Sequence, residues 1–167
     1  MKSMKSNSSK VLHMGMEHSL EEWQNTKLKW SKPETLIIKE RLDGLSYSQT
    51  TNEEKIVALD DIIFSCSAIY GCPLPTTVEY AEKVSAMLDC LIFEMDYNNF
   101  TMGEIILAMK LNAYGVLCFD DTIAFTGNTI NVFFMAKLLK KYSSRRNIID
   151  GKIRNYLDEH PQTEDKK

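Results

Sequence analysis

Apolar residues recur at helical spacing along most of this chain. Steps of three and four residues separate Ile56, Leu59, Ile63, Cys66 and Tyr70, and the same steps separate Tyr80, Val84, Met87, Leu91 and Met95. This spacing places side chains on one face of an α-helix. Two long helices with core-facing stripes are therefore expected in the middle of the chain.

Pairs of a hydroxyl residue and a glutamate three positions later mark the predicted helix starts. Such a pair forms a capping box, in which the two side chains accept hydrogen bonds from backbone N–H groups at the helix start. Five pairs precede apolar segments, and they are Ser19 with Glu22, Ser31 with Glu34, Thr51 with Glu54, Thr76 with Glu79 and Thr101 with Glu104. Repetition on this scale favours a structural signal over chance.

Glycines mark the predicted helix ends. Gly44, Gly71 and Gly115 follow the apolar segments, where a residue in the left-handed conformation commonly ends a helix. Together, the start and end signals predict helices over residues 20–30, 33–43, 52–70, 77–97 and 102–114.

The pattern changes after Gly115. Residues 116–125 mix aromatic, β-branched and acidic residues without helical spacing, which predicts a loop or a short hairpin. Helical spacing returns at Asn131, with an apolar stripe formed by Val132, Met135, Leu139 and Tyr142. Ser143 and Ser144 are expected to break this helix, and a last helix is expected to end near His160.

These elements predict an all-α protein with a single orthogonal or bundle-like domain of six or seven helices. The domain is expected to span residues 16–160, between a flexible N-terminal arm over 1–15 and a flexible tail over 161–167. The longest apolar runs are too short for a membrane span, and no signal peptide is evident. Four irregularly spaced cysteines favour reduced thiols, so a soluble cytoplasmic protein is expected.

Several reaction classes lack the residues that they need. No histidine lies between residues 19 and 159, which argues against a di-iron bundle and against a hydrolytic triad. The cysteines form no zinc-binding pair, and the glycines form no phosphate-binding loop. No catalytic residue, metal ligand or cofactor is therefore predicted. A metal-dependent phosphoesterase stays open as an alternative if acidic residues converge in the fold, namely Asp60, Asp61, Glu94, Asp96, Glu104, Asp120 and Asp121.

Charge is unevenly distributed along the chain. Residues 51–127 contain 3 basic and 12 acidic residues, whereas residues 128–160 contain 7 basic and 3 acidic residues. The basic residues of this C-terminal region are Lys137, Lys140, Lys141, Arg145, Arg146, Lys152 and Arg154. Lysines and arginines in such a cluster bind phosphates or an acidic partner, and Arg145 and Arg146 are expected at a helix junction that exposes both guanidinium groups. The alternative is a solvated face that balances the acidic middle of the molecule.

Two stretches resemble a known group of proteins. The first contains Glu104, Ile105, Ala108, Asn112 and Gly115, and the second contains Asn131, Phe134, Lys137, Leu139, Tyr142 and Arg145. Their pattern is similar to that of small uncharacterised helical proteins of Bacteroidales phages and mobile elements. The resemblance implies an accessory role in phage or plasmid biology and supplies no catalytic residues. We therefore expect a non-enzymatic accessory protein that binds nucleic acid, or a replication or host protein, through its basic C-terminal helices.

Overall fold

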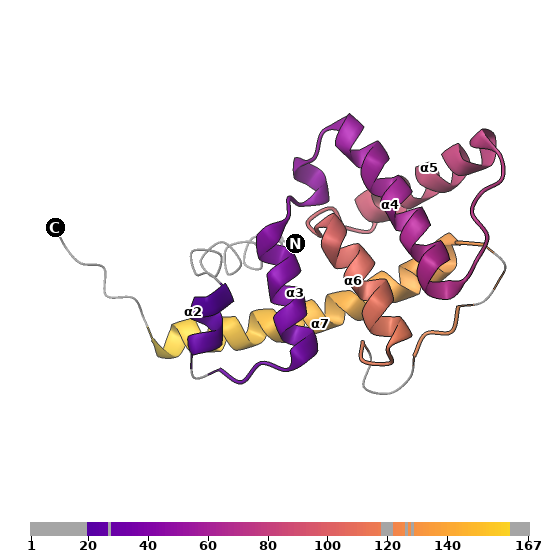
Figure 1. The fold of residues 1–167 in the computed structure, drawn as a ribbon. Helices are drawn as coiled ribbons and strands as arrows, with labels where there is room; N and C mark the ends of the chain where they lie inside the picture. Colours follow the sequence, from indigo (N-terminus) through magenta and orange to yellow (C-terminus); the bar gives the residue numbers. More distant parts are fainter. Residues whose placement is uncertain (1–19, 27, 118–121, 126, 128, 161–167) are drawn as a thin grey trace, which may run out of the picture.

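The computed structural model describes residues 20–26, 28–117, 122–125, 127 and 129–160. Their regular structure consists of six α-helices and one 3-10 turn (Figure 1). In chain order these are α2 (Leu20–Asn25), α3 (Lys32–Asp43), η1 (Tyr47–Gln49), α4 (Asn52–Tyr70), α5 (Val78–Glu94), α6 (Met102–Ala113) and α7 (Val132–Glu159). The described residues contain no strand, and the predicted all-α class is confirmed. The predicted arm and tail lie outside the described residues.

Three of the predicted capping boxes are present at helix starts. Ser31, Thr51 and Thr101 each accept a hydrogen bond from the backbone N–H of the glutamate three residues later, whose side chain accepts one in return. The pair at Thr76 was a wrong prediction, because α5 is capped by Thr77, whose side chain accepts from the N–H of Tyr80. Ser19 lies outside the described residues.

The glycines end helices in two different ways. Gly71 and Gly115 have φ angles of +68° and +69°, in the left-handed region that favours glycine. The prediction of a left-handed Gly44 was wrong, since its φ is −122° and its backbone is extended. At Gly44 the chain turns away from α3 toward η1, close to the side chain of Thr101.

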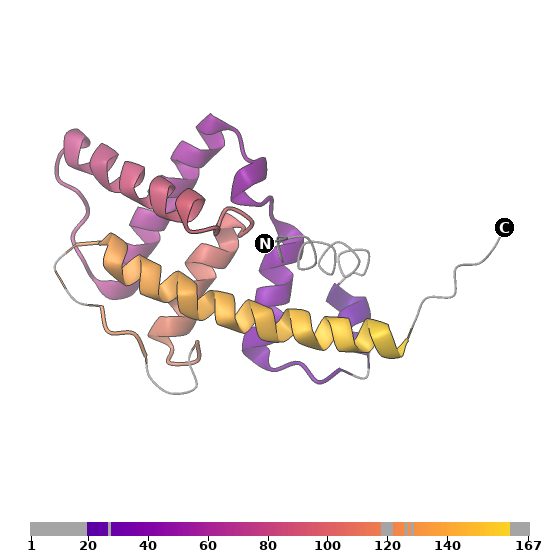
Figure 2. The same ribbon diagram turned by 180° about the vertical axis from the view of Figure 1, so that it is seen from behind.

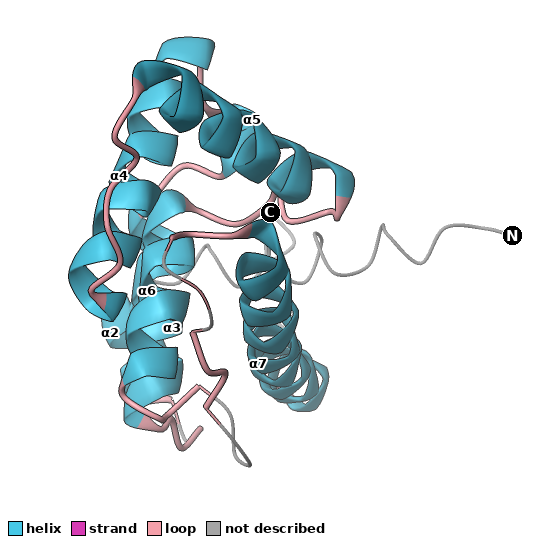
Figure 3. Cartoon of the chain, turned by 90° about the vertical axis from the view of Figure 1, so that its right-hand side faces the viewer, coloured by secondary structure: helices cyan, strands magenta, loops and turns pink. Residues whose placement is uncertain are grey.

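Helix α6 lies at the centre of the fold and packs against α3, α4 and α7. Ile105, Ala108 and Met109 of α6 have no exposed surface. Figure 3 shows α7 along one side of this layer, and the reverse view in Figure 2 shows its whole length across the molecule. Helix α5 packs against α4 and α7, and α2 packs against α3. One side of α7 therefore faces the core, and the other faces solvent.

The two long central helices are rotated relative to the sequence prediction. Helix α4 buries Leu59, Ile63 and Cys66 as expected, but Ile56 is 63% exposed because Ala58 and Ile62 complete the buried face. Helix α5 buries Val84, Leu88, Leu91 and Ile92, whereas Tyr80, Met87, Met95 and Cys90 are exposed. Apolar residues occur on more than one side of each helix, so spacing alone did not identify the side that meets its neighbours.

The described part of the predicted loop or hairpin, residues 116, 117 and 122–125, is loop and contains no strand. The side chain of Asn112 on α6 forms two hydrogen bonds with the backbone of this loop. Its Nδ2 donates to the Ile123 carbonyl at 2.9 Å, and its Oδ1 accepts from the Ile123 N–H at 2.8 Å. The same Nδ2 donates to the Tyr70 hydroxyl at 3.0 Å. Within the described residues, no helix is long and apolar enough to cross a bilayer.

Candidate nucleic-acid interface

The basic C-terminal region forms one continuous helix rather than two. Helix α7 contains 28 residues, which corresponds to a length of about 42 Å at 1.5 Å per residue. The predicted break at Ser143 and Ser144 was wrong. Ser144 Oγ donates to the Lys140 carbonyl at 3.2 Å, within the helix, and buried residues continue on both sides of the two serines, from Leu139 to Ile149.

Arg145 lies on the inner side of α7 and is 9% exposed. Its Nε donates to the Leu117 carbonyl at 2.9 Å, and its Nη2 donates to the Val116 carbonyl at 3.0 Å. These are carbonyls of the segment that follows α6. Arg145 therefore secures that segment to α7, and the expected exposure of its guanidinium at a helix junction was wrong.

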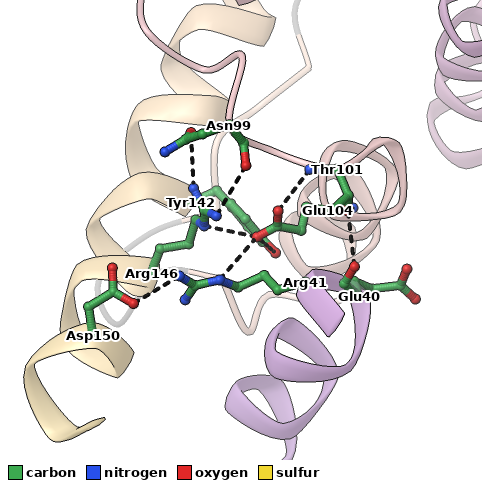
Figure 4. Close-up of polar contacts among 8 residues, drawn as sticks. All are labelled: Glu40, Arg41, Asn99, Thr101, Glu104, Tyr142, Arg146 and Asp150. Atoms are coloured by element: carbon green, nitrogen blue, oxygen red, sulfur yellow. Dashed lines mark hydrogen bonds and ion pairs between the residues drawn. The ribbon is translucent and has the colours of Figure 1, made fainter. Parts of the chain in front are cut away.

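Arg146 is also directed inward and is 6% exposed (Figure 4). Its Nε lies 2.9 Å from Glu104 Oε1 in an ion pair that lacks the alignment of a hydrogen bond. Its Nη1 donates to Asn99 Oδ1 at 3.2 Å, and its guanidinium carbon lies 4.3 Å from the ring centroid of Phe100. The predicted exposure of Arg146 was therefore wrong as well.

Glu104 connects three helices through buried charges. Its Oε1 lies 4.0 Å from Arg41 Nε on α3, and Arg41 Nη2 donates to Asp150 on α7 at 2.9 Å (Figure 4). Burial raises the pKa of Glu104, and the two arginines act in the opposite direction. Burial and the nearby charge of Arg41 lower the pKa of Arg146, although the carboxylate of Glu104 acts to raise it. Two arginines and two carboxylates balance in charge, so this network is suited to holding α3, α6 and α7 together.

Lys152 forms an ion pair with the N-terminal part of the fold. Its Nζ lies 2.8 and 2.9 Å from the two carboxylate oxygens of Glu34 and 5.5 Å from the ring centroid of Trp30. Burial raises the pKa of Glu34, but hydrogen bonds from Lys152 and Ser31 outweigh it, and the pKa lies below its ordinary value. A third predicted cation therefore has a partner within the molecule.

The other four predicted cations lie on the outer side of α7. Lys137, Lys140, Lys141 and Arg154 are exposed, and none has an ion pair with another described residue. The aliphatic chain of Lys137 brings its Nζ to 4.2 Å from the ring centroid of Phe133, which is itself 68% exposed. The first carboxylates on the exposed surface of α7 are Asp158 and Glu159, at its end.

Polar residues that the sequence analysis did not single out complete this surface. Ser144, Asn147 and Asn155 are exposed and alternate with the cations at steps of three and four residues. We define the outer face of α7 as Phe133, Lys137, Lys140, Lys141, Ser144, Asn147, Ile148, Gly151, Arg154 and Asn155. The same spacing rule that identified the apolar stripe would have found this face, had a break not been placed at Ser143 and Ser144.

The acidic residues considered for a metal site lie in different environments. Asp60 and Asp61 are exposed on α4, Glu94 is exposed at the end of α5, and Glu104 is buried between two arginines. In the part of the chain that the structure describes, no group of three histidine, cysteine, aspartate or glutamate residues is placed to hold a metal ion. Asp120 and Asp121 lie outside that part.

Comparison of the chain with protein-family models, with curated proteins and with solved structures gives no match.

Proposed function

We propose that this protein is a non-enzymatic accessory protein that binds nucleic acid through the outer face of α7. The supporting observation is the charge of this face, which carries four exposed cations and, from Phe133 to Asn155, no carboxylate. Exposed lysine and arginine side chains that form no ion pair with the described residues are available to displace counterions from phosphates. From the residue pattern over 104–115 and 131–145 we also propose phage or mobile-element biology as the setting of this activity.

The length of the outer face suits a nucleic-acid backbone. Lys137 and Arg154 are 17 positions apart, which is about 26 Å along a helix. Consecutive phosphates along one duplex strand advance by about 3.4 Å, so this distance is several phosphates long. Serine and asparagine side chains between the cations are suitable donors to phosphate oxygens and to base edges.

A binding measurement with a matched control tests this proposal. We expect the full chain to bind fluorescently labelled duplex or single-stranded DNA or RNA at about 50 mM salt, and to lose affinity as salt rises. Replacing Lys137, Lys140, Lys141 and Arg154 with glutamine removes the cations of the outer face. The control variant replaces four exposed lysines of other helices with glutamine, namely Lys32, Lys39, Lys83 and Lys110.

Both variants change the net charge by the same amount. The proposal predicts a large loss of affinity for the outer-face variant and a small loss for the control. Equal losses would indicate nonspecific attraction to any cation on the surface. No detectable binding by the unmodified chain would favour a protein partner instead.

A metal-dependent phosphoesterase is the second candidate from the sequence. The scattered positions of Asp60, Asp61, Glu94 and Glu104 give it less support than the outer face gives to nucleic-acid binding. A rise in melting temperature on addition of Mg²⁺ or Mn²⁺, together with hydrolysis of a phosphodiester, would favour it.

A further inference from the structure

An acidic groove lies on the surface at the end of α3, next to the starts of α4 and α6. Its volume is about 540 Å³. Apolar side chains in its lining include Leu45, Val57 and Met102, and Leu45 and Val57 are 58% and 61% exposed. The acidic residues of the lining are Glu40, Asp43, Glu53, Glu54 and Asp61. Throughout its described lining there is no lysine, arginine or histidine.

Most of these carboxylates have no partner among the described residues. Glu54 accepts a hydrogen bond from the N–H of Thr51 in the capping box of α4. Glu40, Asp43, Glu53 and Asp61 make no side-chain hydrogen bond or ion pair within the described part of the chain. Like charges that line one groove repel each other, and a cationic ligand relieves this repulsion. An apolar surface between them favours a ligand that also carries apolar side chains.

The N-terminal segment of this chain has both the positive charges and the apolar side chains that such a ligand needs. Residues 1–19 contain Lys2, Lys5 and Lys10 and a single acidic residue, Glu17. Apolar residues stand among and after the lysines, and they are Met1, Met4, Val11, Leu12, Met14 and Met16. The segment is too poor in apolar residues to form a core by itself. The groove offers apolar surface and opposite charge together.

The segment is long enough to reach the groove. It joins the described chain at α2, which packs against α3, and Asp43 at the end of α3 lines the groove. Helix α3 has 12 residues, or about 18 Å at 1.5 Å per residue. Lys10 precedes Leu20 by ten positions, which extend to at most about 33–36 Å. Tethering at this distance also gives the segment a high effective concentration at the groove.

We propose that the acidic groove lined by Asp43, Glu53 and Asp61 is the docking site of the N-terminal segment of the same chain. Lys5 and Lys10 meet the carboxylates, and Val11 and Leu12 cover the apolar surface of Leu45 and Val57. This inference does not depend on the nucleic-acid role of α7, because the groove contains no α7 residue.

Limited proteolysis of the full chain by chymotrypsin, which cleaves after Leu12, tests the docking. Cleavage at this site follows the fraction of molecules in which the segment is undocked. The groove variant Asp43→Asn/Glu53→Gln/Asp61→Asn should be cleaved about tenfold faster, which corresponds to about 1.4 kcal/mol at 25 °C. The matched control Asp60→Asn/Glu82→Gln/Glu94→Gln neutralises three exposed carboxylates that do not line the groove, and it should be cleaved at the rate of the unmodified chain.

A variant of the N-terminal segment provides a second test, which stays valid even if the groove variant misfolds. Lys2→Gln/Lys5→Gln/Lys10→Gln leaves the described residues unchanged and should also accelerate cleavage about tenfold. Synthetic peptides of residues 1–19 with lysine or glutamine at these positions correct for the intrinsic preference of the protease. Salt at about 0.5 M should accelerate cleavage of the unmodified chain, because screening weakens the contact.

Two results would overturn the proposal. Equal corrected rates in the unmodified chain and the segment variant would show that the lysines hold no docked state. Protection that disappears on dilution of the protein would show that the segment occupies the groove of a second copy rather than its own.

Discussion

The two sides of helix α7 carry cations in opposite situations. On the inner side, Arg146 is 6% exposed and faces the carboxylate of Glu104, which has no exposed surface. On the outer side, Lys140 and Lys141 are exposed and have no ion pair with a described residue. The inner cation is already committed to the fold, whereas the outer cations are available to a ligand. The net charge of a segment does not distinguish inner from outer cations, because it counts the charged residues on both sides of the helix.

The inner side of α7 explains how the C-terminal helix is attached to the rest of the molecule. Arg146 and Asp150 reach Glu104 and Arg41, which belong to α6 and α3. Buried ion pairs of this kind contribute little net stability relative to apolar side chains, but removal of one partner leaves an uncompensated charge. The comparison therefore predicts large effects on stability from the inner side and almost none from the outer side.

The largest expected effect follows from Glu104→Gln. The substitution keeps the size of the side chain but leaves Arg41 and Arg146 facing each other without a buried carboxylate between them. We expect a loss of about 3–5 kcal/mol in the free energy of unfolding, measured by urea denaturation. The control Glu94→Gln changes an exposed carboxylate and should alter stability by less than about 0.5 kcal/mol. Similar small effects for both variants would contradict the structural role of the network.

The continuity of α7 predicts the next effect. Ser144→Pro removes an N–H from the interior of an unbroken helix and places the ring against the preceding turn, which should destabilise the protein by about 3 kcal/mol or more. Ser144→Ala should alter stability by about 0.5 kcal/mol at most. Far-ultraviolet circular dichroism and urea denaturation measure both. A proline variant as stable as the alanine variant would place a helix break where the sequence suggested one.

The ion pair between Glu34 and Lys152 predicts a smaller, pH-dependent effect. Lys152 is partly exposed, at 36% for its side chain, and solvent screens such pairs, so Glu34→Gln should cost up to about 1 kcal/mol at pH 7. Glu34 has a lower pKa in the folded state than in the unfolded state, so its contribution is present above the unfolded pKa. It is lost as pH falls through the folded pKa. The stability difference between the two proteins should therefore shrink as pH falls below about 4, and a constant difference would contradict this role.

The sequence predicted the helices better than it predicted their orientation. Capping boxes at Ser31, Thr51 and Thr101 are local signals that involve four neighbouring residues, and the structure contains all three. The buried side of a helix depends on distant partners, which is why Ile56 and Met87 were predicted on core-facing stripes but are exposed. A helix start can be predicted from a few neighbouring residues, whereas the buried side of a helix can be predicted only when its neighbours in the fold are known.

At the candidate site, too, the sequence did not reveal which residues have partners that are distant in the chain. Four of the seven cations are exposed, but Arg145 and Arg146 are buried and have partners that are 28 to 47 positions away in the chain. No spacing rule within α7 reveals Glu104 or the carbonyl of Leu117. The predicted helix break at Ser143 and Ser144 was wrong because serine is found both where helices end and inside helices, where its hydroxyl can donate to a backbone carbonyl as that of Ser144 does.

The outer face should contribute least to stability. Replacing Lys140 and Lys141 with glutamine removes exposed charges that form no ion pair with a described residue, so the free energy of unfolding should change by less than about 0.5 kcal/mol. Thermal and urea denaturation of the double variant measure this. A larger loss would mean that these lysines support the fold and are not free to bind phosphates.

The most direct test of the account is the salt dependence of nucleic-acid binding by two variants of α7. Each lost phosphate contact flattens the slope of log affinity against log salt by about 0.7–0.9, so Lys140→Gln/Lys141→Gln should flatten it by about 1.4–1.8. Lys152→Gln removes a cation that is paired with Glu34 and should leave the slope unchanged. A flattened slope for Lys152→Gln together with an unchanged slope for the double variant would contradict the assignment of binding to the outer face.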